Sequence, residues 1–231
     1  MNTKTKIEGS IIIGIDEVGR GPIAGPVCVC AFMLKKEEYE SFIQTAKDFL
    51  GLSLRDSKKL TKKCREKWFA YLRKQKENGL CDYQTAFVSN EMIDKFGIAK
   101  CINKAVGESL RKITSQNLSN FSRFTSEEPY TDKNLKDSVS HTQFRLLLDG
   151  GLKAPKEFED QESFVKGDEL HPIISLASVV AKVSRDKIME NYAKDYKEYD
   201  FEKNSGYGTR AHYEAIKVHG ITPIHRKSFL H

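Results

Sequence analysis

No long hydrophobic run occurs in this chain. The apolar stretch nearest the N-terminus, residues 11 to 13, is far too short for a membrane span, which needs about 20 residues, and it reads as a strand. No signal peptide pattern precedes it. We therefore expect a cytoplasmic protein that makes no membrane contact.

Cysteine is sparse and without pattern. The five cysteines show neither paired metal-ligand spacing nor a disulfide framework, and the histidines at 171, 212 and 225 have no metal spacing either. Small buried thiols in a reducing compartment explain the cysteines best. The chain also has no internal repeat, and no glycine loop that leads into a helix in the way that cradles a phosphate. That last absence weighs against a small-molecule enzyme of the α/β class.

The composition is that of a globular protein with a basic excess. The chain has 231 residues, of which 39% are hydrophobic and 30% charged, so one large domain with a real core is expected. The formal charge is +6. This excess fits a polyanionic partner such as nucleic acid, and it fits equally well a basic surface with no specific partner.

Hydrophobic periodicity predicts alternating strands and helices. The pattern favours an α/β or α+β fold with a mixed sheet. Residues 114–142 are rich in Ser, Thr, Asn and Asp without apolar period, which predicts a long mobile loop or insertion. We expect strands over 10–15, 27–34, 82–88, 144–148 and 163–166, and helices over 36–50, 61–77, 89–110, 172–199 and 209–220.

Three of the expected strands end in acids: Asp16 with Glu17, Asp149, and Asp168. If these ends converge, the carboxylates repel one another unless divalent cations lie among them, and oxygen ligands favour Mg²⁺ or Mn²⁺. The alternative for each acid is an ordinary turn or helix cap. Asp16 and Glu17 are adjacent, so on a regular strand they point to opposite faces. They are expected to share a site only if the strand breaks or one contributes its carbonyl.

With these residues in view, the chain closely resembles ribonuclease HII, the type 2 ribonuclease H of bacteria. The resemblance implies a ribonuclease H-like fold: a mixed five-stranded sheet flanked by helices, with a helical C-terminal segment. Six blocks carry it, in family order: GIDEVGRGPIAGPV (14–27), RDSKKLTKKCRE (55–66), LLLDG (146–150), KGDELHPIISLASVVAKVSRDKIM (166–189), GYGT (206–209) and PIHRKSF (223–229).

The resemblance also implies an activity: metal-dependent hydrolysis of the RNA strand of RNA–DNA hybrids, and incision on the 5′ side of single ribonucleotides in duplex DNA, as in ribonucleotide excision repair. The products would carry 3′-hydroxyl and 5′-phosphate ends, and two Mg²⁺ or Mn²⁺ ions would take part. Asp16 and Asp149 match the main metal ligands of the family. Glu17 and Asp168 match the acids that complete the second metal site or orient water.

Recognition of the substrate is implied by further matches. The loop Gly19-Arg20-Gly21 resembles the element that reads the ribose 2′-hydroxyl, and Tyr207 resembles the tyrosine that packs on the neighbouring deoxyribose. Lys58 is expected to bind a phosphate. Lys182, Arg185 and Asp186, one helical turn apart, either serve the phosphate path or form structural ion pairs.

The same resemblance suggests how the chain is divided. We expect a disordered tail over 1–9, a catalytic domain over 10–200 with the insertion at 114–142, and a C-terminal segment over 201–231 that carries the substrate tyrosine, in a monomer. Leu176 and Gly208 depart from the family pattern. Leu176 bears on the packing of its helix, and Gly208 bears on the conformation of the loop that carries Tyr207. The alternatives are ribonuclease HIII, which lacks the Gly-Arg-Gly element, and a catalytically silent nucleic-acid-binding module.

Overall fold

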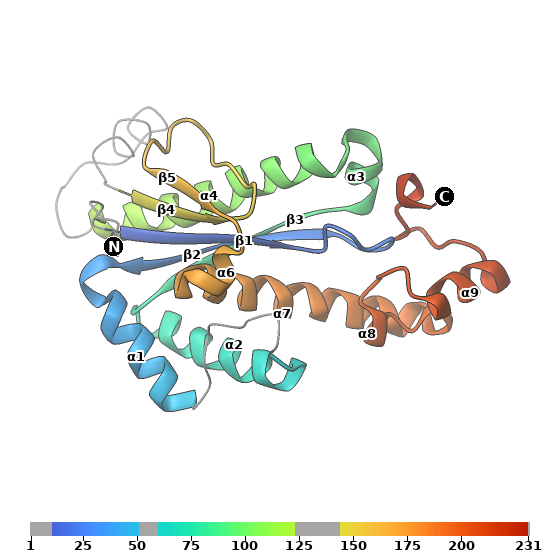
Figure 1. Cartoon of the computed structure of the whole chain (residues 1–231), viewed down its shortest axis with the longest axis horizontal. Helices are drawn as coiled ribbons and strands as arrows, with labels where there is room; N and C mark the ends of the chain where they lie inside the picture. The colour runs from blue at the N-terminus through green and yellow to red at the C-terminus, as the bar shows by residue number, and fades with distance from the viewer. Residues whose placement is uncertain (1–10, 51–59, 123–143, 231) are drawn as a thin grey trace.

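The computed structural model describes residues 11–50, 60–122 and 144–230 (Figure 1). Five strands form one sheet in the order β3-β2-β1-β4-β5. β1, β2 and β3 pair antiparallel, whereas β4 and β5 run parallel to β1. The mixed five-stranded sheet is therefore confirmed. The strands are β1 (Ile11–Val18), β2 (Val27–Lys35), β3 (Asp82–Val88), β4 (Phe144–Asp149) and β5 (Gln161–Phe164).

Helices cover both faces of the sheet (Figure 1). One face packs against α1 (Tyr39–Leu50), α2 (Lys62–Glu77) and α7 (Pro172–Asp195), and the other against α3 (Asn90–Phe96) and α4 (Ile98–Ser122). Successive side chains of a strand point to opposite faces. β1 and β2 therefore contribute apolar side chains to both cores, which is why these central strands read as nearly continuous hydrophobic runs.

Helix α7 lies directly against β1. A Cβ atom placed on Gly14 of β1 would stand 2.4 Å from the carbonyl oxygen of Ile173, so only glycine allows this approach. Leu176, which departs from the family pattern, is fully buried in the same core. The close contact places the first turn of α7 against the middle of β1.

Two expectations for the middle of the chain are wrong. The single helix expected from residue 89 is divided at Gly97, whose φ of +80° ends α3 before α4 begins. The loop expected over 114–142 is wrong for residues 114–122, because α4 continues to Ser122. The Thr114 hydroxyl donates to the Leu110 carbonyl oxygen at 2.9 Å, which shows how a polar side chain is satisfied within the helix. The remainder of that segment, residues 123–142, lies outside the described residues.

The C-terminal residues form a small helical unit at the end of α7. Helix α7 stops at Asp195 rather than at the expected residue 199, and it is followed by η3 (Lys197–Tyr199), α8 (Phe201–Asn204), α9 (Arg210–His219) and η4 (Lys227–Phe229). Two short helices complete the inventory of described elements: η1 (Lys36–Glu38) and α6 (Gly167–Leu170). The helix expected over 209–220 is present as α9, and Thr209 caps it, since its hydroxyl accepts from the His212 N–H at 3.2 Å. Within the described ranges no helix is long and apolar enough to cross a membrane.

Candidate active site

Three acids meet at one edge of the sheet. Asp16 and Glu17 lie near the end of β1, and Asp149 is the last residue of β4. Because β1 and β4 are parallel, their carboxyl ends lie side by side. Carboxylate oxygens of all three residues lie within 4.8 Å of one another. The convergence that the sequence suggested for these three acids is therefore present.

The sequence predicted that the adjacent Asp16 and Glu17 share a site only if β1 breaks or if one of them contributes its carbonyl, and neither condition is needed. The strand continues to Val18, paired with β2 throughout. Its pairing with β4 ends earlier, at Ile15, and beyond this point none of the described strands pairs with β1 on that side. One oxygen of Asp16 also accepts from the Glu17 N–H at 2.8 Å, which turns its carboxylate along the strand. The two side chains can thus meet at the end of an unbroken strand.

Asp168 is not at the end of a strand. β5 ends at Phe164, and Asp168 lies in the short helix α6, where it is buried. The first N–H groups of this helix point at Asp149: its Oδ1 accepts from the N–H of Gly167 at 2.6 Å and from the N–H of Asp168 at 3.4 Å. Asp168 is therefore next to the cluster through its backbone, while the three carboxylates that meet are those of Asp16, Glu17 and Asp149.

The environment of Asp16 favours its neutral form in the absence of a cation. Burial first, and then repulsion by Asp149 and Glu17, raise the pKa of Asp16 to about 8, although a hydrogen bond from Ser178 and the charge of Lys182 oppose the rise. Both opposing residues project from α7. The close carboxylates of this cluster repel one another when ionised, and a bound cation would reduce that repulsion. Its donors are all carboxylate oxygens, which suit hard ions such as Mg²⁺ and Mn²⁺.

The buried side chain of Arg226 holds the backbone of the loop after β1 in place. Gly19 adopts a φ of +86°, and a Cβ there would lie 2.3 Å from Nε of Arg185. The buried Arg226 guanidinium donates to the carbonyl oxygens of Gly19 at 2.7 Å, Arg20 at 3.1 Å and Gly25 at 2.9 Å. The backbone of the Gly19-Arg20-Gly21 loop is therefore held in one conformation by a residue more than 200 positions away.

Arg185 has the same kind of role. Its buried guanidinium donates to the carbonyl oxygens of Pro26 at 2.8 Å, Ala24 at 3.2 Å and Ser205 at 2.9 Å, which joins α7, the loop and the C-terminal unit. Both possibilities considered for Arg185, the phosphate path and an ion pair, are therefore replaced by bonds to backbone carbonyls. The sequence carries no local signal for such contacts, since both arginines are read as ordinary basic residues.

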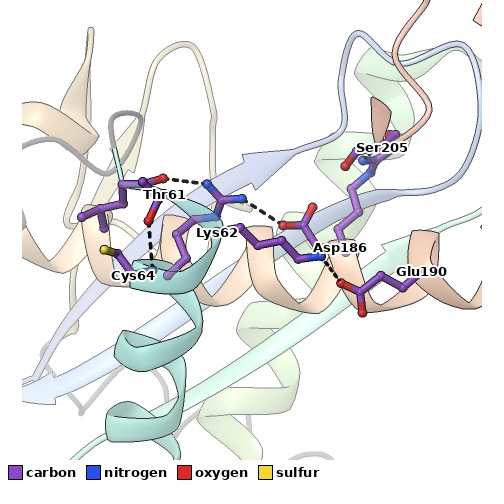
Figure 2. A network of polar contacts seen from close by, with 9 residues as sticks. Thr61, Lys62, Cys64, Asp186, Glu190 and Ser205 are labelled. Carbon is purple, nitrogen blue, oxygen red and sulfur yellow. Dashed lines mark hydrogen bonds and ion pairs between the residues drawn. The ribbon is translucent and has the colours of Figure 1, made fainter. Parts of the chain in front are cut away.

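Asp186 forms a structural ion pair, one of the two possibilities left open by the sequence. Its carboxylate lies 3.1 Å from Arg65 of α2, and Lys62 of α2 lies 2.6 Å from Glu190 of α7. Figure 2 shows these contacts side by side along α7, and it also labels Ser205, which follows α8. These pairs attach α2 to α7. Lys58, expected to bind a phosphate, lies outside the described residues.

Tyr207 lies beside the Gly19-Arg20-Gly21 loop. A Cβ on Gly21 would be 3.9 Å from the Tyr207 ring, and the Tyr207 residue is 48% exposed. Gly206 joins the two segments, because its carbonyl oxygen accepts from the N–H of Ile23 at 2.9 Å and of Ala24 at 3.2 Å. The Arg20 side chain is also exposed, with its guanidinium 3.8 Å from the carboxylate of Glu17. The glycine loop, Tyr207 and the acids at the end of β1 thus lie next to one another at one surface.

The absence of a side chain at Gly208 has a visible consequence. A Cβ there would lie 2.8 Å from the ring of Tyr213 in α9, so glycine leaves room for that ring against the loop. The carbonyl oxygen of Tyr207 accepts from the Thr209 N–H at 2.8 Å. The loop that the departure from the family pattern placed in question is therefore held by packing and by hydrogen bonds.

Sequence reasoning missed two residues of this region. Ser178 bonds to the buried Asp16, and Arg226 holds the loop. Ser178 lies two positions beyond Leu176 in a block that matches the family, yet nothing distinguishes it there from a core serine. Arg226 belongs to the PIHRKSF block, which matches the family, and its guanidinium binds the backbone of the glycine loop.

Comparison with known proteins agrees with this arrangement. The chain is 38% identical over 218 residues to ribonuclease HII of Endomicrobium trichonymphae, covering 94% of this chain and 84% of the relative. It is 36% identical over 225 residues to ribonuclease HII of Fusobacterium nucleatum, covering 97% and 87%. A chain of the PCNA:RNase HII complex from Archaeoglobus fulgidus superposes with a TM-score of 0.61 at 22% identity, over 96% of both chains, which bears on the fold alone.

The match to the family itself is nearly complete. The sequence model described as Ribonuclease HII covers residues 13–231, which include the acids, the glycine loop and Tyr207. This match also decides between the two related families considered above. The chain belongs to the ribonuclease HII family of metal-dependent ribonucleases, which hydrolyse the RNA strand of RNA–DNA hybrids.

Proposed function

We propose that this protein incises the phosphodiester bond on the 5′ side of single ribonucleotides embedded in duplex DNA, in addition to cleaving RNA–DNA hybrids. The products would be 3′-hydroxyl and 5′-phosphate ends. The observation that carries the proposal is the placement of three carboxylates, within 4.8 Å of one another, beside a rigid glycine loop and an exposed tyrosine. The first group suits phosphodiester hydrolysis, and the second suits the recognition of one sugar.

The acids would hold the metal. Asp16 and Asp149 are proposed as the main ligands of Mg²⁺ or Mn²⁺, with Glu17 and Asp168 completing a second site or orienting water. Bound there, two divalent ions supply an activated water and stabilise the leaving oxygen of a phosphodiester. The oxygen-only donor set supports this assignment, and so does the environment of Asp16, in which burial and then repulsion by Asp149 and Glu17 raise the pKa.

The chain's own residues prepare these ligands. The N–H groups of Gly167 and Asp168 donate to Oδ1 of Asp149 and so hold its carboxylate in place beside Asp16 and Glu17. The hydrogen bond from Ser178 orients the carboxylate of Asp16, and the positive charge of Lys182 offsets part of the negative charge of the acids before a cation binds. Preorganised ligands of this kind need little rearrangement on binding.

Discrimination between ribose and deoxyribose is assigned to the loop. Arg226 engages the carbonyl oxygens of Gly19 and Arg20, so the loop presents a fixed backbone surface to the substrate. The 2′-hydroxyl is the group that distinguishes the two sugars. The exposed guanidinium of Arg20 is suited to a phosphate or to that hydroxyl, and the ring of Tyr207 is placed to pack on the neighbouring deoxyribose. Lys58 is proposed as a further phosphate contact.

The wider setting follows from this activity. We expect a monomer in the cytoplasm that acts in ribonucleotide excision repair. The five cysteines support a reducing compartment, since all of them are free thiols and four are buried. The basic excess of the chain supports a nucleic-acid substrate.

A cleavage assay tests the proposal. Three end-labelled duplexes are compared: DNA with one embedded ribonucleotide, an RNA–DNA hybrid, and all-DNA, each with Mg²⁺, with Mn²⁺ or with a chelator. We expect a nick 5′ to the single ribonucleotide, cleavage of the hybrid, and no cutting of all-DNA or of any duplex without metal. Equal cutting of all three duplexes would remove the role given to the loop. Binding without cleavage of any of them would favour the silent binding module.

A further inference from the structure

A chain of buried hydrogen bonds ends at the backbone of Tyr207. His225 lies between α9 and η4, and its Nδ1 lies 2.9 Å from both the N–H nitrogen and the hydroxyl oxygen of Thr222. Its Nε2 lies 3.0 Å from Nε2 of His212 in α9. Nδ1 of His212 in turn lies 2.9 Å from the carbonyl oxygen of Tyr207. Both imidazoles are almost completely buried, so water does not substitute for these partners.

The ends of this chain determine where its protons are. A carbonyl oxygen only accepts, so Nδ1 of His212 must carry a proton and donate it to Tyr207. A backbone N–H only donates, so Nδ1 of His225 must accept from Thr222. With both rings neutral, His225 carries its proton on Nε2 and donates to the bare Nε2 of His212. One arrangement of tautomers therefore satisfies every bond.

The surroundings favour these neutral rings. Aromatic rings of Tyr199 and Phe201 pack against the pair, with Tyr199 5.3 Å from His225 and Phe201 5.3 Å from His212 between ring centroids. Burial and the neighbouring His212 lower the pKa of His225 to about 4, and burial lowers that of His212. A second proton on His212 would place two N–H donors opposite each other at the contact with His225, and a second proton on His225 would remove the acceptor of the Thr222 N–H, leaving only the Thr222 hydroxyl oxygen, 2.9 Å from Nδ1, to accept it.

We propose that His212 and His225 are positioning residues that hold the Tyr207 loop against the Gly19-Arg20-Gly21 loop through this chain of hydrogen bonds. The inference rests on the proposed role of Tyr207 as a substrate contact. His225 is well placed for it, because its backbone forms a bridge with Ala24, and Arg226 next to it bonds to Gly19 and Arg20. The two imidazoles thus connect Tyr207 to the residues around His225, which in turn contact the Gly19-Arg20-Gly21 loop.

The two histidines act on Tyr207 through its backbone carbonyl oxygen. Tyr207 is exposed, so its ring gains little from burial, and the loop around it is short. Two donors hold its carbonyl oxygen: the Thr209 N–H at 2.8 Å and the His212 ring at 2.9 Å. Removing the imidazole donor leaves one bond to hold the turn. The orientation of the ring toward the neighbouring sugar then becomes less well defined.

A double-mutant cycle with a conservative rescue tests the inference. His212→Leu removes both contacts of the ring, whereas His212→Asn keeps a donor at the position of Nδ1. Loss of one positioning hydrogen bond predicts a fall of about tenfold in kcat/KM for the embedded-ribonucleotide duplex with His212→Leu. We expect His212→Asn to recover most of that loss. In the background of Tyr207→Ala, His212→Leu should change kcat/KM by less than about twofold, because the residue through which it acts is gone.

Two controls make the result decisive. His219→Leu, an exposed position of the same helix, should leave kcat/KM unchanged. Long-range ¹H–¹⁵N spectra of the unaltered, histidine-labelled protein should show a proton on Nδ1 of His212 and on Nε2 of His225. Spectra with the opposite tautomers, or equal losses from His212→Leu with and without the Tyr207 ring, would overturn the positioning role. Failure of the unaltered protein to cut the duplex, with the expected tautomers present, would instead overturn the proposed function and the role that rests on it.

Discussion

The contact between β1 and α7 leads to a prediction about Gly14. In Gly14→Ala the new methyl group would lie 2.4 Å from the carbonyl oxygen, 2.5 Å from the carbonyl carbon of Ile173 and 2.8 Å from the N–H nitrogen of Ile174. These are backbone atoms, so no side-chain rotation relieves the overlap. The helix must move away by roughly 1 Å to reach an ordinary van der Waals separation. Overpacking of this kind costs about 1–3 kcal/mol.

The same displacement should reduce catalysis. Helix α7 carries Ser178 and Lys182, which act on the buried Asp16 at the end of β1. A misplacement of about 1 Å in a catalytic group can cost roughly a hundredfold in rate. We therefore expect Gly14→Ala to lower both the free energy of unfolding and kcat on the RNA–DNA hybrid.

Urea denaturation and hybrid cleavage measure the two effects. Gly151→Ala is the matched control for stability, since a Cβ at Gly151 meets nothing within 4 Å. We expect its free energy of unfolding to stay within about 0.5 kcal/mol of the original. If Gly14→Ala is as stable as Gly151→Ala and cleaves at the original rate, then the close approach of α7 to β1 does not support the site.

Three further predictions concern the acids, the buried histidines and the basic surface. Asp16→Asn should reduce metal-dependent cleavage by about a thousandfold or more, while thermal melting without metal shows a fold at least as stable, because a repelled carboxylate is removed. The pKa of His225 is about 4 in the folded chain and 6.5 ordinarily, so the unfolded chain binds more protons between these pH values. The free energy of unfolding should therefore fall by roughly 3 kcal/mol as the pH drops from about 6.5 to 4. Urea titrations across this range measure that loss, and His225→Gln should lack it. Binding of the hybrid to Asp16→Asn, followed by fluorescence anisotropy, should weaken linearly in log–log form as salt rises, and a flat response would contradict phosphate recognition.

Much of this architecture follows from local sequence patterns. Hydrophobic periodicity predicted all five described strands and the starts of α2 and α9 to within a few residues, because the period of side chains depends on near neighbours. The placement of acids after apolar strands indicated four candidate carboxylates, of which three meet in the structure. The order of the six sequence blocks predicted the family.

The errors lie where local pattern competes with distant contacts. Polar composition predicted a loop from residue 114, yet α4 continues to Ser122. The alternation of side chains predicted that Asp16 and Glu17 share a site only if β1 breaks or one contributes its carbonyl, yet carboxylates of both meet on a strand that is paired with β2 to its end. Asp168 follows an apolar stretch in the sequence but lies in α6, whose N–H groups bind Asp149.

The sequence by itself determined the strands, the helix starts, the inventory of acids and the family, because each of these depends on residue type and short spacing. Only the tertiary structure decided which carboxylates meet, how α6 holds Asp149, and that Arg185, Arg226 and the two buried histidines hold the substrate loops. The physical reason is that these contacts join groups far apart in the chain. A guanidinium or an imidazole shows no local sign of the distant carbonyl oxygen that it will bind once the chain has folded.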